Sequence, residues 1–143
     1  MSENVHTAGC FCGAVEMTVT GSPVAMGFCH CTSCKTWAAS PMNPFTLWPQ
    51  GSVKVTKGAE HVGSFSKSPT TRRQFCKVCG GSLSTAHAPW GLEGVFAPVI
   101  KDFNFTPMMH VNYAEKMISV KDGLPKFKDL PKDFGGSGET LPE

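Results

Sequence analysis

The sequence predicts a mainly β fold with short helical turns. Its 15 glycines and 11 prolines are spread over the whole chain of 143 residues, and the apolar runs between them are short. Glycines and prolines at this spacing are typical of many strands joined by turns, and they leave no long segment free for a helix. Seven cysteines fall into three close groups, which predict that metal ions tie the strands together. The content of 41% hydrophobic and 17% charged residues is that of a globular domain with a core.

The expected strands follow one another along most of the chain. The first covers residues 14–20, where β-branched residues alternate with other types. The other expected strands are residues 45–48, 53–56, 61–66, 71–75, 81–85, 94–99, 110–113 and 117–120. Turn-forming residues such as Gly58, Pro69 and Gly91 separate them. Helix is expected only as short turns, at residues 31–39 and near residues 101–104, because neither segment is long enough to be stable alone.

We expect one domain over residues 1–134 and a flexible C-terminal tail over residues 135–143. The tail contains three glycines and a proline but few apolar residues, so it offers little surface to bury. No internal repeat and no change of composition marks a second domain.

The cysteine groups have the spacings C-x-C, C-x-C-x-x-C and C-x-x-C. They are Cys10 and Cys12; then Cys29, Cys31 and Cys34; and finally Cys76 and Cys79. A disulfide framework normally has an even number of cysteines in an oxidising compartment. Here the number is odd, and the first eight residues, MSENVHTA, lack the basic and apolar regions of a signal peptide. We therefore expect reduced thiols in a cytoplasmic protein, with no membrane segment.

The spacing favours two different metal sites. Cys10 and Cys12 are two residues apart, so an extended segment turns both side chains to one side. Gly80, directly after the C-x-x-C pair, tolerates the positive φ that such a turn commonly needs. The first and last groups together supply the four thiolates of a closed structural zinc site. The central group supplies three ligands, which leaves a coordination position open for chemistry.

Two alternatives remain open at this point. The central three cysteines and one of the others can share a single ion, which leaves the remaining three as the open set. The central group can also be a second structural site that is closed by one of the histidines, such as His30, His87 or His110.

The net charge gives no support for a nucleic-acid partner once metal is considered. The formal net charge is +2. Seven thiolates would add −7 and two zinc ions +4, which changes the net charge to −1 because bound thiols are deprotonated. A local basic cluster can still hold a carboxylate substrate. It consists of Lys67, Arg72, Arg73 and Lys77.

Three segments resemble, in order and separation, the glutathione-dependent formaldehyde-activating enzyme family, which also includes the centromere protein V group. They are residues 9–15 (GCFCGAV), 28–34 (FCHCTSC) and 73–81 (RQFCKVCGG). The resemblance runs from about residue 9 to residue 127. It includes the Ser68-Pro69 turn, His110 and the closing Asp122-Gly-Leu-Pro. One departure is Met117, which stands where an aromatic residue, often tryptophan, is usual.

The resemblance implies an Mss4-like, zinc-stapled β-sheet fold with two zinc ions. The implied structural set is Cys10, Cys12, Cys76 and Cys79, and the implied catalytic set is Cys29, Cys31 and Cys34. The implied activity is that of a carbon-sulfur lyase that forms S-hydroxymethylglutathione from glutathione and formaldehyde. The implied partners are glutathione or another small thiol and a small aldehyde, with neither nucleic acid nor membrane.

The chemistry of a three-thiolate site favours a thiol substrate independently. Zinc on three thiolates is a weaker Lewis acid than zinc on three histidines, so it suits a substrate sulfur better than water splitting. No general acid is predicted, since His30 lies between two ligands and should point away from them, and the two later histidines are open candidates. The alternative function is a non-enzymatic zinc module that binds a protein or chromatin partner. A methionine sulfoxide reductase is disfavoured because the clusters use every cysteine.

Overall fold

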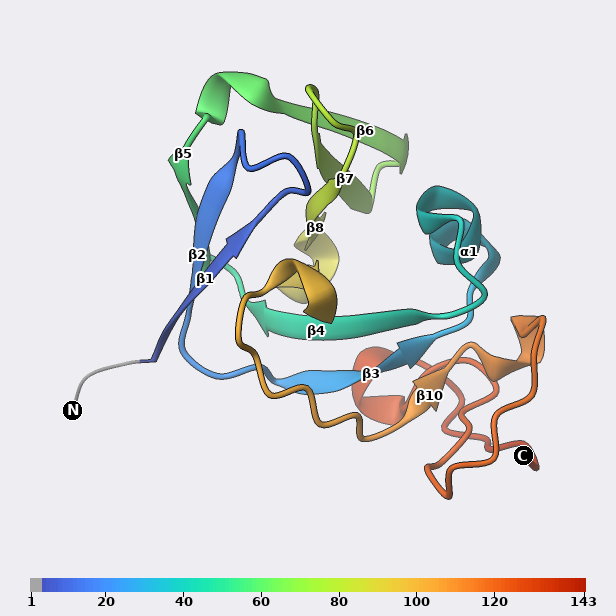
Figure 1. Ribbon diagram of the computed structural model, residues 1–143. Helices are drawn as coiled ribbons and strands as arrows, with labels where there is room; N and C mark the ends of the chain where they lie inside the picture. Colours follow the sequence, from blue (N-terminus) through green and yellow to red (C-terminus); the bar gives the residue numbers. More distant parts are fainter. Residues whose placement is uncertain (1–3) are drawn as a thin grey trace. The chain divides into compact units, whose positions relative to one another are not determined.

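The computed structural model describes residues 4–143, which form two compact units. The first unit comprises the described residues up to Ala25 together with Thr46–Phe105, and the second comprises Met26–Phe45 and Thr106–Glu143. Strands predominate in both, and α1 (Thr32–Ala38) is the single α-helix of the described residues (Figure 1). The prediction of a mainly β fold is confirmed, and the architecture is consistent with an Mss4-like sheet. The expectation of one domain over residues 1–134 stays a prediction.

The first unit contains two groups of strands. One is an antiparallel sheet in the order β1 (Val5–Gly9), β2 (Glu16–Thr20) and β5 (Val53–Lys57). The other has the order β9 (Leu92–Phe96), β8 (Ser82–His87), β7 (Thr71–Cys76) and β6 (Val62–Ser68), and β4 (Asn43–Pro49), of which the residues from Thr46 onward belong to this unit, lies beside β9. Three short 3-10 turns lie between strands, at η1 (Ala59–His61), η2 (Ala88–Trp90) and η3 (Ala97–Val99).

Trp48 is the largest side chain in the core of the first unit. It is fully buried, and Met17 and Leu83 belong to the same buried cluster. The indole Nε1–H donates to Thr46 Oγ1 at 2.8 Å, so burial leaves no unpaired donor on the ring. Trp48 lies near the end of β4, among other buried residues of that strand.

Parallel pairing of two short strands forms the centre of the second unit. These strands are β3 (Ala25–Cys29) and β10 (His110–Val111). Phe28 N–H donates to the Met109 carbonyl oxygen at 3.0 Å. A Cβ at Gly27 would collide with the same carbonyl, so this approach of the two segments requires glycine. The unit also contains α1 and the 3-10 turns η4 (Tyr113–Glu115) and η5 (Lys132–Phe134).

The expected elements and the observed ones differ at a few places. The expected strand at residues 94–99 ends at Phe96 and continues as a 3-10 turn, because Pro98 has no N–H for a ladder. Residues 117–120 form no strand, and Val120 N–H donates instead to Tyr113 Oη at 2.9 Å. Residues 101–104 form no helix, and β1 and β3 were not expected.

Residues 135–143 make several backbone contacts within the second unit. Leu141 N–H donates to the Lys126 carbonyl at 2.7 Å, and Lys128 N–H donates to the Glu139 carbonyl at 2.8 Å. Thr140 forms an antiparallel bridge with Phe127. The flexibility expected of this segment stays a prediction, and these contacts identify the bonds that such motion would break.

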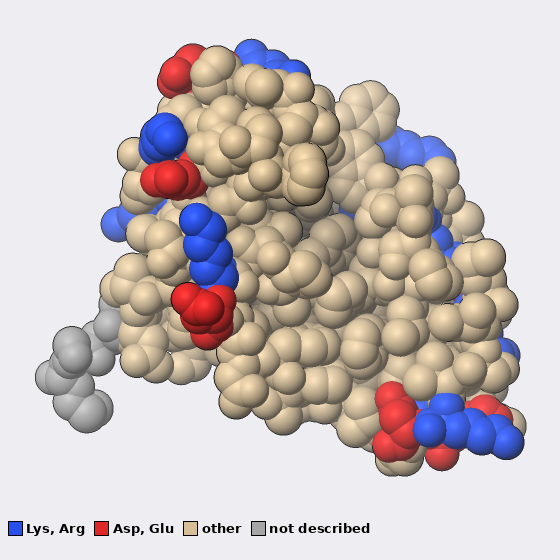
Figure 2. Space-filling view, viewed as in Figure 1, with Lys and Arg blue, Asp and Glu red and all other residues tan. Residues whose placement is uncertain are grey.

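Charges on the β1-β2-β5 sheet are mixed in sign. Figure 2 shows basic and acidic groups side by side over these strands. Lys57 of β5 and Glu16 of β2 form an ion pair, with 4.0 Å between Nζ and Oε1, and both side chains are exposed. The charges on the part of this sheet seen in Figure 2 are therefore of both signs. Within residues 4–143, none of the helices has the length and apolar character needed to span a membrane.

Candidate metal centres

Four cysteine sulfurs meet in the first unit. Those of Cys10, Cys12, Cys76 and Cys79 all lie within 4.8 Å of one another. The sulfur of Cys12 is 3.7 Å from that of Cys10 and 3.8 Å from that of Cys76. A tetrahedral zinc ion with Zn–S bonds of about 2.3 Å separates its sulfurs by about 3.8 Å. The donor set and its size therefore fit zinc.

Three of these four cysteines lie in tight hairpin loops, and the fourth, Cys76, is the last residue of β7. Cys10 and Cys12 lie in the loop from β1 to β2, where Gly13 has φ 82°. Val15 N–H donates to Cys10 Sγ at 3.3 Å. The loop aims its N–H groups at sulfur, which stabilises the thiolate form that a metal binds.

The loop from β7 to β8 is built in the same way. The chain turns at Gly80, with φ 78°, which meets the positive φ expected after the C-x-x-C pair. Gly81 N–H donates to Cys79 Sγ at 3.3 Å, and Val78 N–H donates to Cys76 Sγ at 3.4 Å. The Gly81 N–H, followed by the backbone N–H of Cys12, lowers the pKa of Cys79 to about 6. Cys79 is therefore ready to bind metal near neutral pH.

Three cysteine sulfurs meet in the second unit, at the turn from β3 into α1. Those of Cys29, Cys31 and Cys34 all lie within 4.8 Å of one another. Cys29 ends β3 and is buried, whereas the other two are half-buried. Cys31 is the N-cap of α1, and its Sγ accepts from Cys34 N–H at 3.3 Å. The strand-to-helix turn thus gathers three thiols into what we call the central cluster.

No fourth protein ligand joins the central cluster among residues 4–143. His30 is fully buried, and its Nε2 lies 2.8 Å from His110 Nδ1. His87 belongs to the first unit. The structure brings the cysteines together in the predicted groups of four and three, and it supplies no histidine that closes the smaller group. The role of each cysteine as a metal ligand stays a prediction.

The pKa values of two thiols in the central cluster, Cys29 and Cys31, are raised. Hydrogen bonding with the Cys31 thiol, then with the Cys34 thiol, together with burial, raises the pKa of Cys29 well above its ordinary value. Three negative sulfurs so close together repel one another strongly unless a cation lies between them. A metal cation would replace the thiol protons and relieve that repulsion, so the donor chemistry of this cluster also fits a soft dication such as zinc.

Two residues around the central cluster were not found by sequence reasoning. Asn112 Nδ2 donates to Cys29 Sγ at 3.6 Å, and Glu115 Oε1 accepts from Thr32 N–H at 3.0 Å at the start of α1. Lys35 Nζ donates to the Glu115 carbonyl oxygen. Asn112 and Glu115 each lie 83 residues along the sequence from their partners. No local sequence pattern indicates a contact between residues so far apart.

The basic residues expected to hold a carboxylate lie in the first unit. Arg72 and Arg73 are neighbours on β7, where they pair with Ala86 and Thr85 of β8. The second unit, which contains the central cluster, has basic groups of its own. One is Lys35 on α1, and another is Lys116, whose Nζ lies 4.8 Å from the centre of the Tyr113 ring.

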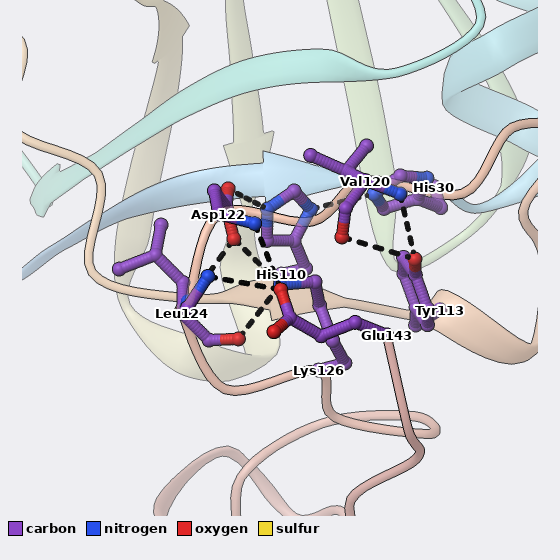
Figure 3. A network of polar contacts seen from close by, with 9 residues as sticks. His30, His110, Tyr113, Val120, Asp122, Leu124, Lys126 and Glu143 are labelled. Carbon is purple, nitrogen blue, oxygen red and sulfur yellow. Dashed lines mark hydrogen bonds and ion pairs between the residues drawn. The ribbon is translucent and has the colours of Figure 1, made fainter.

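A buried polar network lies in the second unit (Figure 3). His110 is fully buried, and its Nε2 lies 2.7 Å from Asp122 Oδ2. An ionised carboxylate only accepts, so His110 Nε2 donates. In a neutral His110, Nδ1 is then the acceptor for His30 Nε2–H. Burial, followed by the neighbouring His110, lowers the pKa of His30 to about 4, which keeps His30 uncharged near neutral pH.

Lys126 is a buried cation at the other end of this network. Its side chain is 1% exposed, and its Nζ lies 2.6 Å from Asp122 Oδ1 and 2.8 Å from Glu143 Oε2. It also donates to the Leu124 carbonyl oxygen at 2.8 Å. Burial opposes ionisation of Asp122, but hydrogen bonds from Lys126 and then from His110 outweigh it and hold the pKa of Asp122 well below its ordinary value.

Glu143 is expected to make stability depend on pH in acid. Hydrogen bonds from Lys126, then from the N–H groups of Gly123 and Asp122, lower the pKa of Glu143 from 4.5 to about 2. Its contribution is therefore fully present above pH 4.5 and is lost as the pH falls toward about 2. The melting temperature of the wild type should exceed that of Glu143→Gln above pH 4.5, and this difference should shrink as the pH falls through the interval. Because acid also releases metal from thiolates, both proteins are measured with excess zinc and only at pH values at which the wild type is folded. A difference that does not begin to shrink as the pH falls below 4.5 would contradict the assignment.

A family model, a curated relative and a solved structure are similar to this chain. The model of the family described as glutathione-dependent formaldehyde-activating enzyme matches residues 5–115. An uncharacterized lyase of Schizosaccharomyces pombe is 30% identical over 82 residues, which are 57% of this chain and 58% of that relative. The match thus spans less than two thirds of the relative's length. A crystal structure of a Rhodobacter sphaeroides protein has a TM-score of 0.58 and 21% identity over 68% of this chain and 90% of that chain, which shows a shared fold.

Proposed function

The chain belongs to the glutathione-dependent formaldehyde-activating enzyme family, and we propose that it is a zinc-dependent carbon-sulfur lyase. Its substrate is a thiol adduct of a small aldehyde, as in S-(hydroxymethyl)glutathione synthases. The observation that carries the proposal is the central cluster: three converging cysteine sulfurs, with no fourth protein ligand among residues 4–143. A site of this kind leaves one coordination position for a substrate atom.

The two clusters have different roles in this proposal. The four-sulfur cluster in the first unit holds a structural zinc ion that ties the β1-β2 loop to the β7-β8 loop. The central cluster of Cys29, Cys31 and Cys34 holds the catalytic ion. When bound there, zinc supplies a soft Lewis acid that favours the ionised form of a substrate thiol.

The reaction itself joins a thiol to an aldehyde or reverses that addition. In the forward direction the thiol loses its proton, and its sulfur attacks the carbonyl carbon. The S–C bond forms as the C=O π bond breaks, and the carbonyl oxygen takes up a proton, which balances the one that the thiol lost. The protein contributes position and a fixed charge environment, because Cys29 lies on a paired strand and Cys31 on a helix cap. The Nε2 atom of His30 is hydrogen-bonded with His110 and is therefore not free to transfer that proton.

The alternative is a non-enzymatic zinc module that binds a protein or chromatin partner. Such a module gains stability from a closed site, and the histidines that were considered for closure do not join the central cluster. The structure therefore favours the enzyme. We also propose that the protein acts in the cytoplasm, where cysteine thiols remain reduced.

The proposal is tested by exchange spectroscopy. Zinc-loaded protein should accelerate the exchange between formaldehyde hydrate and S-(hydroxymethyl)glutathione, which NMR measures at equilibrium and without coupling to another enzyme. Cysteine and a simple monothiol in place of glutathione then define the thiol specificity. Protein that holds zinc at the central cluster but leaves the exchange rate unchanged with every thiol and with larger aldehydes would contradict a lyase acting on thiol adducts.

A further inference from the structure

We propose that Asn112 is a positioning residue of the central cluster, whose amide hydrogen bond to Cys29 strengthens metal binding there. The inference rests on the proposed function, which puts zinc on Cys29, Cys31 and Cys34. The contact that points to it is the N–H···S bond from Asn112 Nδ2 to Cys29 Sγ, at 3.6 Å. An amide that donates to a sulfur atom supports its thiolate form, because a thiolate is an acceptor and cannot donate.

Burial makes this hydrogen bond important for Cys29. Cys29 is the most buried cysteine of the central cluster, at 9% exposure. Its sulfur therefore has little access to water, so polar groups of the protein must stabilise its charge. Zinc on three thiolates carries a formal charge of −1, and a neutral amide donor offsets part of this charge without adding a cation.

The backbone holds Asn112 where its amide can reach this sulfur. Val111 pairs with Cys29 across the parallel β10-β3 ladder, which sets the register of the next residue. Asn112 N–H donates to the Asp129 carbonyl at 2.7 Å, and Glu115 N–H donates to the Asn112 carbonyl at 3.0 Å. The side chain thus leaves a backbone that is bonded on both sides, which is the arrangement expected of a residue that orients a ligand.

Backbone conformation offers a competing reason for asparagine here. Asn112 is left-handed, with φ 54° and ψ 37°, and asparagine tolerates this region better than most residues. Glycine separates the two explanations, because Asn112→Gly keeps the backbone and removes the amide. Asn112→Asp keeps the size and the left-handed tolerance but places an acceptor, and at neutral pH a negative charge, against the Cys29 sulfur.

The experiment compares zinc affinity in the wild type, Asn112→Gly, Asn112→Asp and a control, Asp102→Gly. Asp102 is also left-handed, with φ 52°, and belongs to the first unit. Competition with a chromophoric chelator should show that each Asn112 variant lowers the zinc affinity of one of the two sites by about 10- to 100-fold. The affinity should be lower in Asn112→Asp than in Asn112→Gly. The control should retain both affinities. In cobalt-substituted protein, the sulfur-to-cobalt charge-transfer band should shift in Asn112→Gly and stay unchanged in Asp102→Gly.

The outcomes separate this inference from the proposed function. A wild-type chain that binds a single zinc ion overturns the proposed function and, with it, the role of Asn112. A wild-type chain that binds two ions, together with Asn112 variants of unchanged affinity and spectrum, overturns the inference alone. If Asn112→Gly does not fold, Asn112→Asp decides, because its side chain matches asparagine in size.

Discussion

Replacing Cys31 with serine is expected to remove metal from the central cluster and abolish lyase turnover while leaving the fold intact. The Cys31 sulfur has two roles, as a member of the central cluster and as the N-cap acceptor for Cys34 N–H. Serine loses the first role because its hydroxyl is a poor ligand for soft zinc. It keeps the second, because serine is among the best N-cap residues. Elemental analysis should find one zinc per chain in place of two, with the circular dichroism spectrum unchanged.

Two further variants complete this test. Cys79→Ser removes a ligand from the four-sulfur cluster and should unfold the protein, because structural zinc contributes about 10–16 kcal/mol of folding free energy in zinc-finger peptides. Cys31→Ala should lose metal like Cys31→Ser and should also lose about 1 kcal/mol from the missing helix cap. If Cys31→Ser unfolds the protein as completely as Cys79→Ser, the central cluster is structural and the proposed function is wrong.

Replacing Asp122 with alanine is expected to destabilise the protein by about 3 kcal/mol, the lower end of the range for removing one partner of a buried ion pair. Lys126 is 1% exposed, so its ammonium group depends on protein partners for stabilisation. Alanine removes the nearer of its two carboxylates, and it also leaves His110 Nε2–H and Leu124 N–H without their acceptor. Urea denaturation should report the loss as a lower midpoint at an unchanged slope.

A double variant separates lost pairing from lost packing. Adding Lys126→Met to Asp122→Ala removes the unpaired buried charge, and apolar replacements of a buried pair are often neutral or stabilising. The double variant should therefore recover part of the stability that Asp122→Ala loses. If the second substitution lowers stability further by its full single-variant amount, the two residues act independently and the buried pair is not the source of the effect.

The sequence predicted most of the fold because its strands are bounded by strong turn signals. Gly58, Gly91 and Pro69 separate β-rich segments, and the observed strands begin and end near them. β3 was missed because Gly27 interrupts its pattern, and that glycine is explained by a backbone approach from Met109, which is distant in sequence. Local signals contain no information about such a pairing.

The cysteines of the two candidate metal sites were predictable from the sequence. Short spacings such as C-x-C and C-x-x-C constrain where sulfurs can lie, and both groups came together as the spacing suggested. Asn112 and the buried Lys126 were not predictable. Lysine is almost always exposed unless it is paired, and the partner Glu143 is 17 residues away along an irregular segment.

The central claim is that Cys29, Cys31 and Cys34 hold a zinc ion with one open coordination position. The number of sulfurs per zinc, measured by X-ray absorption on protein of known zinc content, tests this claim most directly. Two zinc ions per chain, one bound by four sulfurs and one by three, should give an average of about 3.5 sulfurs per zinc that rises to about 4 when glutathione is added. An average of 4 before any thiol is added, or a histidine signal that glutathione does not alter, would contradict an open site on Cys29, Cys31 and Cys34.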